Sequence, residues 1–238
     1  MSSDKFTKEN LDVYLKELAK EFRRINGRSM SAEIVLVGGA AILTNYGFRD
    51  MTTDIDAIIH ATSAMKEAIN HVGDKFDLPN GWLNADFMRT GSYSPKLDEF
   101  SVYYKTFYGV LSVRTVTAEY LIAMKLRSGR KFKNDLSDII GVLAEHEKKG
   151  TPITMDKIDM AVVNLYGGWN SISEDVKSFI ENALENGDFA NVYKSVKEDE
   201  LESRDILLEF EKDYPKVVTA SNVDDILKSL KKKKHDDK

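Results

Sequence analysis

The chain has 238 residues, of which 42% are hydrophobic and 31% charged, a composition that excludes a disordered or collagen-like protein. It contains no cysteine, which excludes disulfides, thiolate metal sites and cysteine nucleophiles. With 34 basic and 39 acidic residues its formal net charge is −5, which excludes a uniformly basic coat for nucleic acid but not a local basic patch.

No segment has the length of a membrane-spanning helix. The longest uncharged run, residues 34–48, has 15 residues and contains two consecutive glycines, whereas a spanning helix needs about 20 apolar residues. Residues 1–9 are polar and charged and lack the apolar stretch of a signal peptide. We therefore expect a cytoplasmic protein that makes no membrane contact.

Apolar periodicity predicts an α/β protein of the α+β kind. Helical spacing of apolar residues predicts helices, and β-branched or alternating runs predict strands. In chain order the predicted elements are a helix over residues 8–26, a strand over 33–37, a helix over 40–46, a strand over 54–60, a helix over 62–72, strands over 100–108 and 110–116, and helices over 118–126 and 135–147. Beyond these only helical patterns follow, near 154–165, 173–186, 188–196, 200–212 and 222–232.

These patterns predict four parts. An N-terminal helix within residues 1–29 packs on a small mixed-sheet core over 30–148, and a helical C-terminal domain spans 149–230. The boundary follows from Lys-Lys-Gly-Thr-Pro at 148–152, where charged and turn-forming residues interrupt the periodicity. The charged residues 231–238 are expected to form a disordered tail.

Two acidic residues carry the clearest chemical signal. Asp54 and Asp56 are two residues apart in a predicted strand, so their carboxylates project from the same face and can reach one metal ion. Mg²⁺ prefers such oxygen ligands and is commonly bound by one or two carboxylates together with substrate phosphates. A solvated strand edge is the alternative interpretation of this pair.

A glycine pair precedes the two aspartates. Gly38 and Gly39 lie between a predicted strand and a predicted helix, with 14 residues between Gly39 and Asp54. Free N–H groups at a helix N-terminus attract phosphate, and glycine lets phosphates approach the backbone. Alone, the glycines indicate an ordinary turn. Together with Asp54 and Asp56 they predict a site for a nucleoside triphosphate beside a metal ion, as phosphoryl or nucleotidyl transfer requires.

The order of these motifs resembles a known superfamily. Val-Gly-Gly-Ala at 37–40, followed by Arg-x-x-Thr-Thr-Asp-Ile-Asp at 49–56, resembles the signature of the DNA polymerase β-like nucleotidyltransferases. The similarity is greatest to the branch of AbiEii-type toxins and their uncharacterised prokaryotic relatives. It continues through Gly-Trp-Leu-Asn at 81–84, residues 119–126 and Asp-Leu-Ser-Asp at 135–138.

The resemblance implies roles for the residues of the signature. Asp54 and Asp56 would hold the catalytic metal, Mg²⁺ or Mn²⁺, and Gly38 and Gly39 would contact the triphosphate. This site would catalyse nucleotidyl transfer on a small mixed-sheet core.

Four further residues receive roles from the same resemblance. Arg49 and Thr53, which belong to the signature, would bind the nucleotide. Lys125 resembles the third-motif lysine of AbiEii-type enzymes, which would neutralise phosphate charge, and Asp135 resembles their fourth-motif aspartate. The alternative interpretations are a helix-surface lysine and a helix N-cap.

One expected group is missing from the pattern. Most members of the superfamily use a third carboxylate on a neighbouring strand to complete the metal site or to activate the attacking hydroxyl, but the predicted strand over 110–116 has no acid. Nearby acids are Asp86, Asp98 and Glu99. Substitution by a different acid, catalysis with two carboxylates and loss of activity all remain open.

Two other polar features have competing interpretations. His60 shares a strand face with the aspartates and is either solvated or in contact with substrate, since no two histidines have metal-ligand spacing. The basic stretch over residues 125–133 is either a solvated turn or a contact with a nucleic-acid backbone.

The sequence therefore predicts a Mg²⁺- or Mn²⁺-dependent nucleotidyltransferase that moves a nucleoside monophosphate from an NTP to an acceptor. By resemblance, the acceptor is tRNA or a protein, and the setting is toxin–antitoxin or phage defence with an antitoxin-like partner. The first alternative is a non-catalytic nucleotide- or protein-binding member of the same fold. The second is a small-molecule nucleotidyltransferase of the antibiotic-modifying kind.

Overall fold

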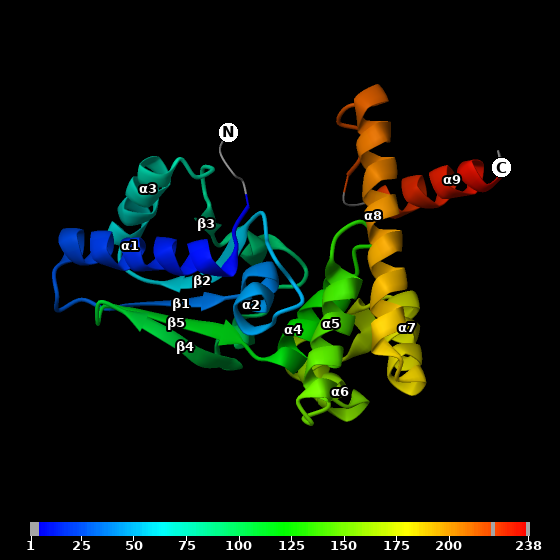
Figure 1. The fold of residues 1–238 in the computed structure, drawn as a ribbon, viewed down its shortest axis with the longest axis horizontal. Helices are drawn as coiled ribbons and strands as arrows, with labels where there is room; N and C mark the ends of the chain where they lie inside the picture. Colours follow the sequence, from blue (N-terminus) through cyan, green and yellow to red (C-terminus); the bar gives the residue numbers. More distant parts are fainter. Residues whose placement is uncertain (1–4, 220–221, 237–238) are drawn as a thin grey trace.

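The computed structural model describes residues 5–219 and 222–236. Within these residues a mixed sheet of strand order β3-β2-β1-β5-β4 carries helices on one face and at one end (Figure 1). β1 runs antiparallel to β2 and parallel to β5, β3 runs parallel to β2, and β4 and β5 form an antiparallel hairpin. The strands are β1 (Ala32–Leu36), β2 (Ile55–His60), β3 (Leu83–Asn84), β4 (Ser101–Phe107) and β5 (Leu111–Val116). The predicted α+β class is confirmed.

Most helices lie where the periodicity predicts them. The α-helices are α1 (Lys8–Asn26), α2 (Gly38–Asn45), α3 (Ala64–Phe76), α4 (Ala118–Ser128), α5 (Asp135–Lys148), α6 (Met155–Tyr166), α7 (Glu174–Asn186), α8 (Phe189–Asp213) and α9 (Val223–Asp236). Three short 3₁₀ turns, η1 (Asp86–Arg89), η2 (Pro95–Asp98) and η3 (Trp169–Ser171), complete the elements of the described residues.

Two predictions for the C-terminal part are wrong. The two helices predicted over 188–196 and 200–212 are one continuous helix, α8. Residues 231–236 were expected to be disordered, but they continue α9, where Lys231 and Lys234 form ion pairs with Asp199 and Glu202 of α8. These ion pairs hold the charged end of α9 against α8. Residues 237–238 lie outside the described residues.

Helix α1 covers the sheet as its pattern predicts. A capping box begins it, in which the Thr7 side chain accepts from the Asn10 backbone and the Asn10 side chain accepts from the Thr7 backbone. Leu15, Leu18 and Phe22 are fully buried on its inner face. α1 and α3 lie side by side on the same face of the sheet (Figure 1).

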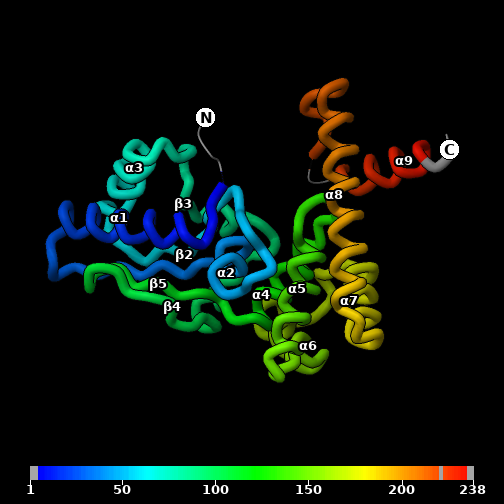
Figure 2. The backbone as a smooth tube through the Cα atoms, viewed as in Figure 1, coloured from blue at the N-terminus to red at the C-terminus, as the bar shows by residue number. Residues whose placement is uncertain are grey.

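Helices α4 to α9 gather beyond one end of the strands (Figure 1). The backbone trace leaves β5, enters α4 and continues through α5, α6 and α7, and α8 then crosses α5 (Figure 2). One buried hydrophobic cluster extends from Phe6 in the N-terminal segment to Phe189 at the start of α8, across the boundary predicted after residue 148. The sheet and the helices thus share one core. The division of the chain into domains stays a prediction.

In the described part of the chain, no helix is both long and apolar enough to cross a lipid bilayer.

Candidate active site

The glycine pair and the two aspartates meet where β1 ends and β2 begins, at one end of the sheet's strands. β1 ends at Leu36 and the chain enters α2 at Gly38, while β2 begins beside it in antiparallel register. The Val37 N–H donates to the Asp56 carbonyl at 3.1 Å, which fixes the two chain segments together. A Cβ built on Gly38 would lie 3.9 Å from Asp56 Oδ2. The N-terminus of α2 therefore lies next to a carboxylate of the Asp-x-Asp motif.

Gly39 faces the loop that leads into β2. A Cβ at this position would lie 2.6 Å from Thr52 Oγ1 and 2.9 Å from Arg49 Nη2. The Thr52 hydroxyl in turn donates to Asp54, whose backbone oxygen and Oδ1 each lie 3.2 Å from it. The absence of a side chain at Gly39 thus lets this loop pack against α2 and orient the Asp54 carboxylate.

Thr52 was not singled out by the sequence. The resemblance pointed to its neighbour Thr53, which is exposed and whose contact with nucleotide stays a prediction. Thr52 is buried and forms two backbone hydrogen bonds with Phe6, at 2.7 and 2.9 Å. Thr52 is buried and Thr53 is exposed only because of how the loop packs against Phe6 and α2, and no signal in the sequence separates the two threonines.

The carboxylate of Asp56 is strongly affected by its surroundings. Burial, and then the neighbouring charge of Asp54, raise its pKa to about 6. The positive charges of Arg130, Lys125 and Lys133 act in the opposite direction and lower the pKa of Asp56. Cations from α4 and from the α4–α5 loop therefore lie close enough to Asp56 to act on its charge.

These cations belong to a buried network of charges. Lys125 Nζ lies 2.8 Å from Asp135 Oδ1 and 2.9 Å from Asp138 Oδ2. Arg130 binds Asp135 with two nitrogens, Nε at 2.7 Å and Nη2 at 3.1 Å. Although burial alone would raise it, Lys125 and Arg130 hold the pKa of Asp135 well below its usual range. Burial opposes the charge on Lys125, but Asp135 and Asp138 outweigh it and raise the lysine pKa.

Arg49, a residue of the nucleotidyltransferase signature, also belongs to this network. Arg49 forms an ion pair with Asp138 through Nη1 and donates to the Met51 carbonyl through Nε. It therefore joins the loop before β2 to α5, and its predicted contact with nucleotide stays a prediction. Arg130 has the most exposed side chain of this set, at 42%, compared with 11% for Lys125. This exposure makes Arg130 a phosphate-binding candidate that the resemblance did not name.

The basic stretch is largely occupied by contacts within the protein. Arg127 donates to the Ser171 carbonyl, and Lys131 lies 3.5 Å from Asp175. With Lys125 and Arg130 also paired, four of the five basic residues of this stretch are engaged. These contacts favour a folded turn over a free nucleic-acid-binding patch.

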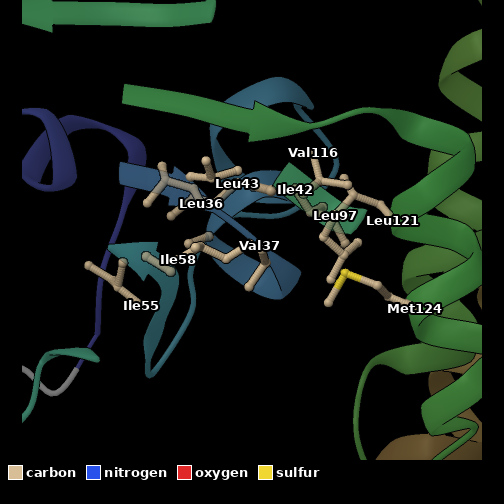
Figure 3. Packing of buried hydrophobic residues seen from close by; sticks show 14 of the residues in the cluster. Leu36, Val37, Ile42, Leu43, Ile55, Ile58, Leu97, Val116, Leu121 and Met124 are labelled. Atoms are coloured by element: carbon tan, nitrogen blue, oxygen red, sulfur yellow. The ribbon is translucent and has the colours of Figure 1, made fainter. Parts of the chain in front are cut away.

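The described residues contain no group of three acidic or histidine side chains able to hold a metal ion. β5 is the neighbouring strand on which a third carboxylate was expected. It ends at Val116, which lies in an apolar cluster with Val37 and Leu97 (Figure 3). On the other side of β2, the residue in register with Asp56 is an amide, Asn84 of β3.

His60 has a partner that neither of its sequence interpretations named. Its Nε2 lies 2.6 Å from Asp98 Oδ2. This contact engages Asp98, one of the three acids considered for the third carboxylate.

The Asp54 and Asp56 pair still fits a Mg²⁺ or Mn²⁺ ion. Burial and the neighbouring charge of Asp54 both raise the pKa of Asp56, and a bound divalent cation would offset the unfavourable charge. Mg²⁺ keeps several water ligands and needs only one or two carboxylates when substrate phosphates supply further oxygens. Two carboxylates beside a helix N-terminus satisfy this donor set.

One of the comparisons with known proteins gives a family for this chain. No curated protein and no solved structure matches the chain significantly. A family model described as "nucleotidyltransferase of unknown function (DUF6036)" matches residues 13–146, more than half of the chain. The matched range includes the glycine pair, both aspartates and the charge network of α4 and α5. The chain therefore belongs to the DUF6036 family of nucleotidyltransferases.

Proposed function

We propose that this protein is a Mg²⁺- or Mn²⁺-dependent enzyme that transfers a nucleoside monophosphate from an NTP to an acceptor and releases pyrophosphate. One observation carries the proposal. The N-terminus of α2 lies beside the Asp56 carboxylate of the Asp-x-Asp motif, and the positive charges of Arg130, Lys125 and Lys133 act on that carboxylate. This arrangement provides an anion-binding backbone, metal ligands and cations at one place.

Each group has a role in the transfer. Gly38, which leaves open space in front of Asp56, lets phosphate oxygens reach the first N–H groups of α2, that of Gly39 among them. Arg130 neutralises charge that develops on the leaving pyrophosphate. Asp54 and Asp56 hold the divalent ion, which supplies charge neutralisation at the reacting phosphate. The acceptor's nucleophile forms a bond to the α-phosphorus while the bond between that phosphorus and the oxygen bridging to the β-phosphate breaks. Pyrophosphate leaves with the electron pair of the broken bond, and the nucleophile's proton passes to solvent.

Lys125 acts mainly by holding the network together. It is buried between Asp135 and Asp138. Lys125 therefore attracts the phosphates from a distance, without direct contact, and it holds its two acidic partners in place. Asp135 likewise orients Lys125 and Arg130 and makes no direct contact with substrate in this proposal.

The resemblance to AbiEii-type toxins supports tRNA or protein as acceptor, and a toxin–antitoxin or phage-defence role with an antitoxin-like partner. The internal pairing of the basic stretch removes one argument for a nucleic-acid acceptor. Both acceptor classes are therefore carried into the test, together with small hydroxylated and amino compounds.

The direct test incubates the protein with Mg²⁺ and each α-labelled NTP, and offers total tRNA, protein and small-molecule acceptors. We expect label transfer by the wild type and none by Asp54→Ala/Asp56→Ala. Asp74→Ala, which removes an exposed acid from α3, serves as the matched control and keeps full transfer. Transfer that persists in the double variant would contradict the proposed site.

The second candidate is a non-catalytic nucleotide-binding protein. The observation that favours it is the lack of a third acidic ligand among the described residues. This candidate predicts Mg²⁺-dependent NTP binding without transfer to any acceptor.

A further inference from the structure

Helix α8 presents a polar stripe to the N-terminus of α5. Lys197, Glu200 and Arg204 are spaced three and four residues apart and so share one helix face. Glu200 is 1% exposed, and its Oε1 accepts from the backbone N–H groups of Leu136 at 2.9 Å and Ser137 at 3.2 Å. Its Oε2 accepts from the Ser137 hydroxyl. This carboxylate caps α5 from a distant part of the chain.

The capped helix end needs such a partner. The first N–H groups of a helix have no acceptor inside it, and the N-cap residue Asn134 forms no side-chain capping bond. The Asn134 Oδ1 instead accepts from Lys197 Nζ at 2.9 Å and from Arg204 Nη2 at 3.1 Å. The stripe thus fixes both the helix end and the residue before it.

The same helix turn carries the acids that hold the cations of the site. Asp135 and Asp138 flank Ser137 in the chain, and they bind Lys125, Arg130 and Arg49. A shift of this turn moves these cations with it. No contact between α8 and Asp54 or Asp56 is needed for this effect.

We propose that the stripe of Lys197, Glu200 and Arg204 on α8 is a positioning element for triphosphate binding, acting through the first turn of α5 on Arg130 and Lys125. The proposal rests on the proposed nucleotide site. It gives helix α8 a role in the chemistry of the candidate active site, although α8 lies outside the matched family range. Glu200 is the central residue of this element because its carboxylate makes three of the contacts.

The first test measures binding of ATP, CTP, GTP and UTP with Mg²⁺ by calorimetry, well below the melting temperature. For the NTP that the wild type binds, we expect Glu200→Ala to weaken affinity about tenfold. The expected loss is one charge-assisted contact between the displaced Arg130 and a phosphate, which has this magnitude. Glu200→Gln keeps an acceptor for the two N–H groups and recovers part of the affinity. Glu198→Ala, on the exposed face of α8, leaves affinity unchanged.

A double-mutant cycle separates positioning from general structural support. If Glu200 acts through Arg130, the double variant Glu200→Ala/Arg130→Ala binds NTP little more weakly than Arg130→Ala alone. Amide exchange at Leu136 and Ser137 is expected to accelerate in Glu200→Ala. Additive losses, or unchanged affinity in Glu200→Ala, would overturn the positioning role while leaving the nucleotide site intact. Absence of NTP binding by the wild type would instead overturn the proposed function, and the positioning role with it.

Discussion

At the scale of single residues, the two positions of the glycine pair require glycine for different structural reasons. Gly38 has a φ of +53°, in the left-handed region that favours glycine, and it leaves space in front of Asp56. Gly39 is required by a close approach of side chains, because Thr52 and Arg49 occupy the place of a Cβ. The sequence predicted a phosphate-binding turn here, but it gave no reason to separate the two positions.

Gly39→Ala is therefore expected to destabilise the protein by about 1–3 kcal/mol, the usual cost of inserting a methyl group into a packed place. Thr52 cannot move away easily, since its backbone is bonded to Phe6. Gly47→Ala is the control, because a Cβ there meets no atom within 4 Å. Urea unfolding of both variants measures the difference, and equal stability would contradict the close packing at Gly39.

The raised pKa of Asp56 predicts a pH-dependent stability. Burial and Asp54 raise the native pKa to about 6, so the native state binds more protons than the unfolded state between about pH 4 and 6. Without metal, the free energy of unfolding should therefore decrease as the pH rises through this window. The effect is at most about 3 kcal/mol for a shift of about two pKa units.

Asp56→Asn removes this effect. Without metal at pH 8, we expect the variant to be more stable than the wild type by about 1–3 kcal/mol, with the difference disappearing near pH 4. Thermal unfolding across the pH range measures it. A variant that is less stable than the wild type at pH 8 would show that the Asp56 charge is not destabilising in the native state.

At the scale of elements, periodicity predicted most helices and strands because their buried faces are apolar. It failed at α8, where Lys197, Glu200 and Arg204 replace apolar residues on the inward face. The polar stripe interrupts the apolar period, so the pattern looked like two helices. The contacts that hold this face are 63 or more residues away in the chain, and local sequence carries no signal for them.

Helix α5 shows a second constraint that periodicity does not reveal. A Cβ on Gly141 would lie 2.4–2.6 Å from three atoms of the Phe48 ring, a rigid side chain that also packs against Tyr193 of α8. Alanine normally stabilises a helix interior relative to glycine by about 1 kcal/mol. At this position the steric overlap reverses the sign.

We expect Gly141→Ala to lower the free energy of unfolding by about 1–3 kcal/mol. Gly73→Ala in α3 is the matched control, because its Cβ would make an ordinary 3.4 Å contact with Trp82 and the substitution is neutral or stabilising. Chemical unfolding of the two variants decides the point. If both substitutions stabilise, the close contact between Phe48 and α5 is wrong.

At the scale of the whole molecule, the charge network joins the sheet to the helices. Arg49 comes from the loop before β2, Lys125 from α4, and Asp135 and Asp138 from α5. The sequence could place Asp54, Asp56 and the glycines together, since a strand-turn-helix unit and one neighbouring strand suffice. It could not predict that Arg49 and Lys125 share Asp138, because that contact depends on how two distant parts of the chain pack.

The central claim is that Asp54 and Asp56 hold a metal-bound triphosphate at the N-terminus of α2. Calorimetric titration of NTPs in the presence and absence of Mg²⁺, with the wild type and Asp54→Asn/Asp56→Asn, tests it without knowledge of the acceptor. We predict that the wild type binds an NTP only with Mg²⁺ and that the double variant loses this binding. Equal Mg²⁺-dependent binding by both proteins, or none by the wild type, would contradict the claim.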